Sequence, residues 1–125
     1  MKQQTLTKSE MQVMNILWDL NRGACVNDIL AQYPDPKPAY TTIATFLKIL
    51  TQKGFVEHKK GTGKLLIYSP LITREKYRRQ VMEEVKDDFF GNSFRSMFSF
   101  FVREEHLTAE EIQELIEQVK KEEKL

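Results

Sequence analysis

The chain is poor in the residues that build disulfides, metal centres and cofactor sites. Its 125 residues include one cysteine, Cys25, and two histidines, His58 and His106. A single cysteine cannot form an internal disulfide, and these three residues lack the spacing of a metal site. A free cysteine usually behaves as a small apolar residue, so we expect Cys25 to be buried or half-buried rather than a redox group or a ligand. We expect no bound metal and no cofactor.

Signals for catalysis are missing as well. There is no glycine-rich phosphate loop and no grouping of Ser, Cys and His that indicates an activated nucleophile. Paired carboxylates do occur, but they fall on amphipathic helical segments as solvent-facing residues: Glu83-Glu84, Asp87-Asp88, Glu104-Glu105 and Glu110-Glu111. An enzyme is therefore not expected.

Long apolar runs are absent. The first ten residues, MKQQTLTKSE, contain no apolar core of a signal peptide, and no later run is long enough to cross a bilayer. We therefore expect a cytoplasmic protein without membrane insertion. With 41% apolar and 30% charged residues, the composition is that of one globular domain, or of a small domain with an appendage.

Charge is present in both signs but is unevenly placed. The net charge is +1, yet residues 1–70 carry nine Lys/Arg against five Asp/Glu, whereas residues 71–125 carry ten against thirteen. The first part of the chain is therefore the part suited to a polyanion.

Two helices are predicted in the first 33 residues. Thr7-Lys8-Ser9-Glu10 has the pattern of a capping box, which predicts a helix that continues to about residue 21. Gly23 is expected to end this helix in the left-handed conformation. A shorter helix is predicted over about residues 26–33, because three prolines between residues 34 and 38 prevent its continuation and stiffen the connection to the next helix.

A third helix and a β-hairpin follow. Helical spacing over about residues 39–53 places Tyr40, Ile43, Phe46, Leu47 and Leu50 on a buried side, and Gly54 marks the end. The opposite side carries Thr41, Thr42, Thr45, Lys48 and Gln52. Two β-prone runs between residues 54 and 70 predict a hairpin whose tip, residues 59–64, holds three lysines and two glycines.

Three helices followed by a hairpin with a basic tip are typical of a winged helix-turn-helix, which places its third helix in the DNA major groove and its hairpin against the backbone. Threonine hydroxyls bond to phosphates or base edges, and lysines neutralise phosphates. The candidate DNA-binding residues are Tyr40, Thr41, Thr42, Thr45, Lys48, Lys59, Lys60 and Lys64. The alternative is a winged-helix protein–protein interaction module, whose association would lack a strong salt dependence.

The C-terminal part is predicted to form three more helices, over about residues 74–88, over residues 94–103, and after a second capping box at Thr108-Ala109-Glu110-Glu111. Residues 89–93 are expected to break the first of them, and residues 120–125 to fray. Six of the eight phenylalanines lie between residues 89 and 101.

So small a region cannot hide these phenylalanine rings internally, so we expect a homodimer rather than packing against the rest of the chain. The candidate dimerisation residues are Tyr77, Val81, Val85, Phe89, Phe90, Phe94, Met97, Phe98, Phe101, Ile112, Leu115 and Ile116. The predicted fold class is mainly α with a small β-hairpin (α+β), with a winged-helix DNA-binding domain at 1–71 and a helical dimerisation region at 72–125.

The order of several short motifs resembles the penicillinase repressor family, the BlaI/MecI/CopY-type bacterial transcriptional regulators. The motifs are Leu6-Thr7, Met14-Asn15-Ile16-Leu17-Trp18, Tyr40-Thr41-Thr42-Ile43, Lys53-Gly54-Phe55, Tyr68-Ser69-Pro70-Leu71, Phe89-Phe90-Gly91, Phe101-Val102 and the Leu107-Thr108 helix start. The resemblance implies a dimeric winged-helix repressor that binds a palindromic operator through the third helix and the hairpin, and that dimerises through its C-terminal helices.

Three departures from the family pattern refine these expectations. Ala44 and Ile49 stand where family members often carry a basic residue, so the operator sequence is expected to differ. Copper-sensing relatives carry Cys-x-Cys pairs, which this chain lacks, so copper control is not expected. The resemblance also implies release through a membrane sensor-protease pathway, with cleavage between Phe100 and Phe101, where Phe100 replaces the family asparagine.

Overall fold

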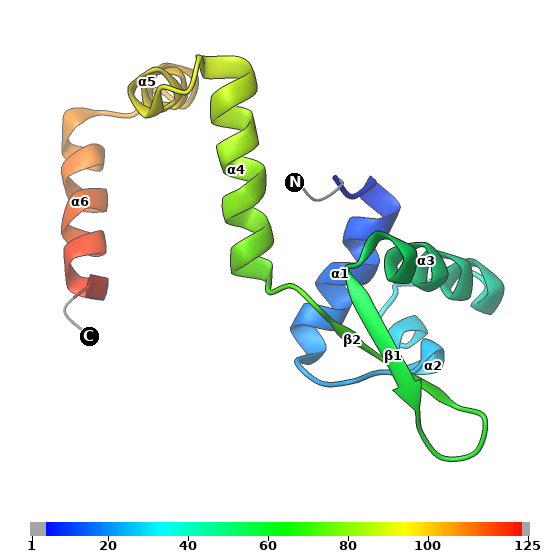
Figure 1. Cartoon of the computed structure of the whole chain (residues 1–125). Coiled ribbons are helices and arrows are strands. Elements are labelled where there is room, and N and C mark those ends of the chain that lie inside the picture. The colour runs from blue at the N-terminus through cyan, green and yellow to red at the C-terminus, as the bar shows by residue number, and fades with distance from the viewer. Residues whose placement is uncertain (1–4, 124–125) are drawn as a thin grey trace. The chain divides into compact units, whose positions relative to one another are not determined.

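The computed structural model describes residues 5–123, and its contacts divide the chain into two units, one up to Gln80 and one from Val81 onward. The first unit contains α1 (Lys8–Leu20), α2 (Val26–Leu30), α3 (Tyr40–Lys53), β1 (Val56–Lys60) and β2 (Leu66–Pro70), as Figure 1 shows. Helix α4 (Arg74–Phe90) begins in the first unit and ends in the second, which also holds α5 (Phe94–Glu104) and α6 (Ala109–Glu123).

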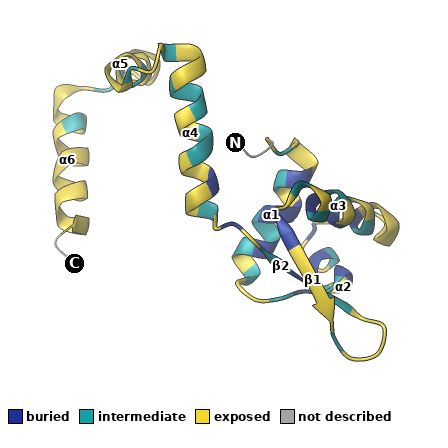
Figure 2. Cartoon of the chain, in the orientation of Figure 1, coloured by how far each residue is buried: buried dark blue, intermediate teal, exposed yellow. Residues whose placement is uncertain are grey.

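The first unit has an apolar core formed by one side of each helix and by the strands. Helix α1 starts with the predicted capping box: the Thr7 hydroxyl accepts from the Glu10 amide at 3.2 Å, and the Glu10 carboxylate accepts from the Thr7 amide at 2.9 Å. Its core residues Val13, Met14 and Leu17 are fully buried, as are Ile43, Leu47 and Leu50 of α3. Figure 2 shows buried positions on α1, on α3 and at the start of β1. The 3.6-residue period of the apolar positions thus determines which side of each helix is packed.

The hairpin is the antiparallel pair β1 and β2, in which His58 lies opposite Tyr68 and Lys60 opposite Leu66. Ala24 adds an isolated bridge to Tyr68, so the segment between α1 and α2 extends the sheet. The predicted hairpin is confirmed, and the loop between its strands projects from the three helices (Figure 1). Lys59 and Lys60 belong to β1, and the chain turns in the five residues that follow.

Three local predictions for the first unit are wrong or only partly right. Asn21, not Gly23, takes the left-handed conformation that ends α1, with φ of 52°. Gly23 has another role, because a Cβ there would lie 2.5 Å from the Ile67 Cγ2 atom. Helix α2 ends at Leu30, three residues early, and Tyr40 is 53% exposed rather than buried because it occupies the first turn of α3, beyond the core. Cys25 is half-buried, as expected.

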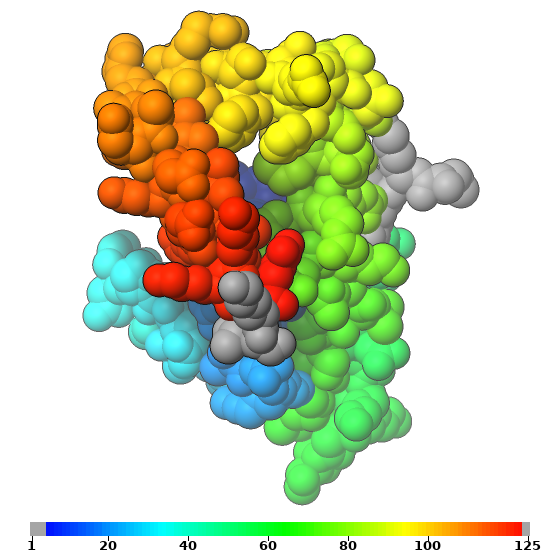
Figure 3. Space-filling view, turned by 90° about the vertical axis from the view of Figure 1, so that its left-hand side faces the viewer, coloured from blue at the N-terminus to red at the C-terminus, as the bar shows by residue number. Residues whose placement is uncertain are grey.

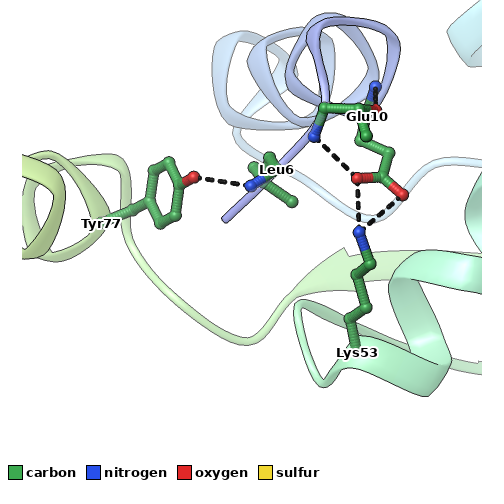
Figure 4. Close-up of polar contacts among 5 residues, drawn as sticks. Leu6, Glu10, Lys53 and Tyr77 are labelled. Atoms are coloured by element: carbon green, nitrogen blue, oxygen red, sulfur yellow. Dashed lines mark hydrogen bonds and ion pairs between the residues drawn. The ribbon is translucent and has the colours of Figure 1, made fainter. Parts of the chain in front are cut away.

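The beginning of α4 is docked on the first unit through Tyr77. This side chain is 6% exposed, and its hydroxyl accepts a hydrogen bond from the Leu6 amide at 2.9 Å (Figure 4). Its ring lies edge-on to Phe55, with a centroid distance of 5.5 Å, and 6.2 Å from Trp18. The indole nitrogen of Trp18 donates to the Ile72 carbonyl at 2.9 Å. Aromatic packing and two hydrogen bonds therefore hold the α4 start against α1.

The second unit consists of the rest of α4 with α5 and α6. Helix α4 continues through Phe89 and Phe90, so these residues do not break it; Gly91 and Asn92, both with positive φ, make the turn. The second capping box is confirmed, with Thr108 and Glu111 exchanging bonds of 3.0 and 3.1 Å. Helix α6 continues to Glu123, so the fraying predicted from residue 120 is wrong for the described part, and residues 124 and 125 lie outside it.

Among the helices that the structure describes, none combines the length and the apolar character needed to cross a membrane.

Candidate nucleic-acid interface

The outward side of α3 carries small polar side chains that point away from the core. Thr41, Thr42, Thr45 and Lys48 are all exposed. The Thr45 hydroxyl donates to the Thr41 carbonyl at 2.9 Å, which commits its proton and leaves its lone pairs and its methyl group available. Thr45 is therefore suited to accept a hydrogen bond or to make an apolar contact, whereas Thr41 and Thr42 keep both hydrogen-bonding functions.

The hairpin contributes exposed positive charge. Lys59, Lys60 and Lys64 are exposed, and none of the salt bridges formed among residues 5–123 involves them or Lys48. Lys53, at the end of α3, differs, because its ammonium lies 2.7 Å from the buried Glu10 carboxylate. The lysines around the outward side of α3 thus remain available for an anion that residues 5–123 do not supply.

A groove of about 410 Å³ separates α3 from the hairpin. Tyr40 and Ala44 line it from α3, and Lys64, Leu65 and Leu66 line it from the hairpin. The groove therefore brings two candidate residues, Tyr40 and Lys64, to opposite walls. At its floor, burial and then the neighbouring Tyr40 raise the pKa of the Tyr68 phenol, so Tyr68 stays neutral at physiological pH.

Sequence reasoning missed part of this groove. Cys25 and Val26 line it because the Ala24–Tyr68 bridge draws the start of α2 toward the hairpin, and no sequence pattern indicates such an isolated bridge. Leu65, 43% exposed, did offer a signal, since it is an apolar residue directly after Lys64 in the hairpin loop.

The two structural units differ more in net charge than the two parts of the sequence divided at residue 70. Up to Gln80, the sequence has 13 Lys/Arg and 6 Asp/Glu, a net charge of +7; from Val81 it has 6 and 12, a net charge of −6. The first unit, which contains α3 and the hairpin, is therefore the one that attracts polyanions, and the second unit repels them.

The second unit presents exposed apolar side chains instead. No residue of α5 or α6 is buried, and Figure 2 shows both helices in the colours of exposed and intermediate residues. The exposed fraction reaches 78% at Phe89 and 66% at Phe94. Figure 3 shows these helices, yellow through orange to red, with their side chains at the surface. A groove of about 370 Å³ is lined almost entirely by apolar residues: Phe98, Ile112, Leu115, Ile116, Val119 and the stem of Lys120.

The candidate dimerisation residues other than Tyr77 divide into two groups by their exposure. Phe89, Phe94, Phe98, Phe101, Leu115 and Ile116 are exposed, while Val81, Val85, Phe90, Met97 and Ile112 are half-buried. Phe100, at the candidate cleavage position, is 39% exposed and lies 5.3 Å from the ring of Phe101. Tyr77 differs from all of these, since its ring is buried within the first unit.

A metal site is not formed by the described residues, among which no group of three or more His, Cys, Asp or Glu side chains converges. The first unit presents an exposed hydroxyl-bearing side of α3 next to lysines that form none of the salt bridges among residues 5–123.

Comparisons with known proteins all identify relatives from one family. The family model described as penicillinase repressor matches residues 6–121. The methicillin resistance regulatory protein MecI of Staphylococcus aureus is 29% identical over 111 residues, which cover 88% of this chain and 89% of the relative. The penicillinase repressor of Bacillus licheniformis is 27% identical over 111 residues, covering 88% and 85%, and that of S. aureus is 25% identical over 115 residues, covering 91% and 90%.

Proposed function

The chain belongs to the penicillinase repressor family, whose model spans residues 6–121, and from this premise we propose that it represses transcription by binding duplex DNA through α3 and the β1–β2 hairpin. The relatives named as repressors and resistance regulators support this role. The observation that carries the proposal is that Thr41, Thr42 and Lys48 are exposed on α3 beside the hairpin lysines, and that none of these lysines takes part in a salt bridge among residues 5–123.

In the proposed complex α3 lies in the major groove. Thr41, Thr42, Thr45 and Lys48 contact base edges and nearby phosphates, because short side chains allow the helix to approach the groove walls closely. The sugar-phosphate backbone of one DNA strand passes through the protein groove between α3 and the hairpin. Tyr40 and Lys64 contact its phosphates there, and Lys59 and Lys60 lie beside them. The protein acts as a binding protein and not as an enzyme.

We further propose a homodimer on a palindromic operator. The exposed apolar side chains of α5 and α6 support a second copy as their partner, because soluble monomers rarely leave so much contiguous apolar surface in water. Tyr77 is left out of the proposed dimer surface, since its ring is already packed against Trp18 and Phe55. Two linked DNA-binding units then read half-sites about one helical turn apart, or a small multiple of it.

Release is proposed to follow the loss of this dimer, through C-terminal proteolysis in a membrane sensor-protease pathway or through another inducing signal. The exposed Phe100 and Phe101 mark the expected cleavage position. A protease pocket built to hydrogen-bond an asparagine amide would leave its polar groups unpaired against the Phe100 ring, so the protease specificity must differ here.

The salt dependence of DNA binding tests the proposal. Changing Lys59, Lys60 and Lys64 together to alanine should lower the slope of log K against log salt by about one per lysine, because each phosphate contact releases about one counterion. The matched control changes Lys76, Arg78 and Lys121 to alanine, which removes the same charge from exposed positions outside α3, the hairpin and the apolar groove of the second unit, and should alter the slope far less.

Sequence selection from random duplexes completes the test. A Thr42→Val variant should shift the preferred sequence without a large change of salt slope, since Thr42 is assigned to base edges. Association that is weak, salt-insensitive and equal in the triple variant and its control would overturn the proposal and favour a winged-helix protein–protein interaction module.

A further inference from the structure

A second hollow in the first unit lies outside α3 and the hairpin loop. This α1–α4 cleft, about 450 Å³ in volume, is formed by the last turn of α1 and the residues after it, by the end of β2, and by the segment that starts α4. Its volume lies in the range of small-ligand pockets, about 300–1,000 Å³. None of its lining residues is among those assigned to DNA, so the proposed function leaves it unexplained.

The charged residues of the cleft are both arginines. Arg22 and Arg74 line it, and no acidic residue does. All side-chain hydrogen bonds of Arg74 among the described residues use one terminal nitrogen, Nη2. It donates to Asp19 Oδ1 at 2.7 Å, to the Asn15 carbonyl at 3.1 Å and to Asn15 Oδ1 at 3.4 Å. The side chain of Arg22 similarly uses only Nη1 within the described residues, which donates to the Gly23 carbonyl at 3.0 Å and to Asp28 Oδ2 at 3.4 Å.

Each guanidinium therefore keeps the N–H groups of its other nitrogens for an additional acceptor. Their side chains are 57% exposed for Arg22 and 41% for Arg74, so both are accessible from solvent. A guanidinium with two free donors binds carboxylate and phosphate oxygens in parallel pairs. The polar part of the cleft is thus suited to a compact anion.

Beside the arginines and the polar residues Asn21, Ser69 and Thr73, the cleft has an apolar part. Leu17 and Trp18 contribute from α1, and Leu71, which is 54% exposed, contributes from the segment after β2. The Arg74 guanidinium stacks over the Trp18 ring at 5.3 Å from its centroid, which holds both groups in place. Trp18 is further anchored by its bond to the Ile72 carbonyl, so the cleft is preorganised by contacts within the first unit.

We propose that the α1–α4 cleft binds a small molecule with one anionic head, carboxylate or phosphate, and a flat apolar body. The anion lies against Arg22 and Arg74, and the body lies against Trp18 and Leu71. The walls include Ile72 and Thr73, which connect β2 to α4, so an occupant contacts the segment from which α4 starts.

Trp18 is the only tryptophan of the chain and therefore reports occupancy directly. Phenyl phosphate carries both parts of the proposed ligand, whereas inorganic phosphate and phenol each carry one. The full-length protein is titrated with each of the three compounds while Trp18 fluorescence is recorded. Saturable change is expected with phenyl phosphate, at about tenfold lower concentration than with either fragment.

Arg22→Gln provides the matched variant, because its exposed side chain can be changed without opening the core. It should weaken phenyl phosphate binding about tenfold, the loss of one charge-assisted interaction, while Arg78→Gln on exposed α4 surface outside the cleft should not. The proposal is overturned by the absence of saturation, by equal binding of phenol and phenyl phosphate, or by equal affinity of the Arg22→Gln variant. No DNA is present, so these outcomes are independent of the proposed function.

Discussion

The ion pair between Glu10 and Lys53 connects α1 to α3, and its removal tests how strongly this contact stabilises the first unit. Glu10 is the one charged residue buried among those described, with 3% of its surface exposed, and Lys53 lies in the last turn of α3. Its ammonium contacts both carboxylate oxygens, at 2.7 and 3.0 Å (Figure 4). The pair therefore joins the start of α1 to the end of the helix assigned to DNA.

We predict that Lys53→Met destabilises the first unit by about 3 kcal/mol. Removing one partner of a buried pair leaves an uncompensated charge, which costs about 3–5 kcal/mol, and the lower value applies because the Lys53 side chain is 20% exposed. Glu10→Gln should cost less, about 1–2 kcal/mol, since glutamine can still accept from the Thr7 amide and the lysine can reach solvent.

The double variant separates pairing from packing. Glu10→Gln with Lys53→Met removes both charges, so its cost should fall short of the sum of the single changes by about 2 kcal/mol. Urea unfolding followed by Trp18 fluorescence measures all four proteins, and Trp18 reports on the first unit. Additive costs, or a Lys53→Met cost within about 0.5 kcal/mol of zero, would refute the reasoning.

The pH dependence gives an independent sign. Burial raises the pKa of Glu10, but hydrogen bonds from Lys53 and Thr7 and the Lys53 charge together outweigh burial, so the net pKa lies below its ordinary value of 4.5. The stability contributed by the carboxylate is therefore present above pH 4.5 and is lost as pH falls through the lower folded-state pKa. Without Lys53, most of the interactions that counteract burial are lost, so the pKa of Glu10 rises. The loss of unfolding free energy caused by Lys53→Met should therefore become smaller between pH 7 and pH 4.

Two further predictions concern the second unit. Ile116→Lys should convert the dimer into a monomer in analytical ultracentrifugation, because Ile116 is 43% exposed in the single chain and lines the apolar groove. Gln118→Lys is the control. A monomeric wild type, or a dimeric Ile116→Lys variant, would contradict the proposed dimer. Mass spectrometry of the repressor from induced cells should show cleavage near Phe100–Phe101, whereas an intact chain under full derepression would exclude proteolysis and point to a ligand or partner.

Local patterns in the sequence determined most of the elements. The capping boxes at Thr7 and Thr108, the left-handed Gly54 and the apolar period of α3 each act through neighbours within a few residues, so their outcome does not depend on the fold. The hairpin between Gly54 and Pro70 followed from β-prone runs around glycines for the same reason. These elements in this order were sufficient to predict the winged-helix architecture.

Helix ends were less predictable, because competing local choices have nearly equal energy. Asn21 and Gly23 both tolerate the left-handed conformation, and what excludes a side chain at Gly23 is the distant Ile67. Phe89 and Phe90 extend α4 because the two positive-φ residues after them make the turn.

Only the tertiary structure decided which polar groups are already used and which remain free. Lys53 and Lys48 lie on the same helix, yet Lys53 is neutralised by Glu10, 43 residues away, whereas Lys48 has no salt bridge within the described part of the chain. Tyr77 looked like the apolar residues that follow it on α4, but its contacts with Leu6 and Phe55 bury it in the first unit. Long-range pairing of this kind depends on how the helices pack, and a periodic pattern in one segment contains no information about its partner in another.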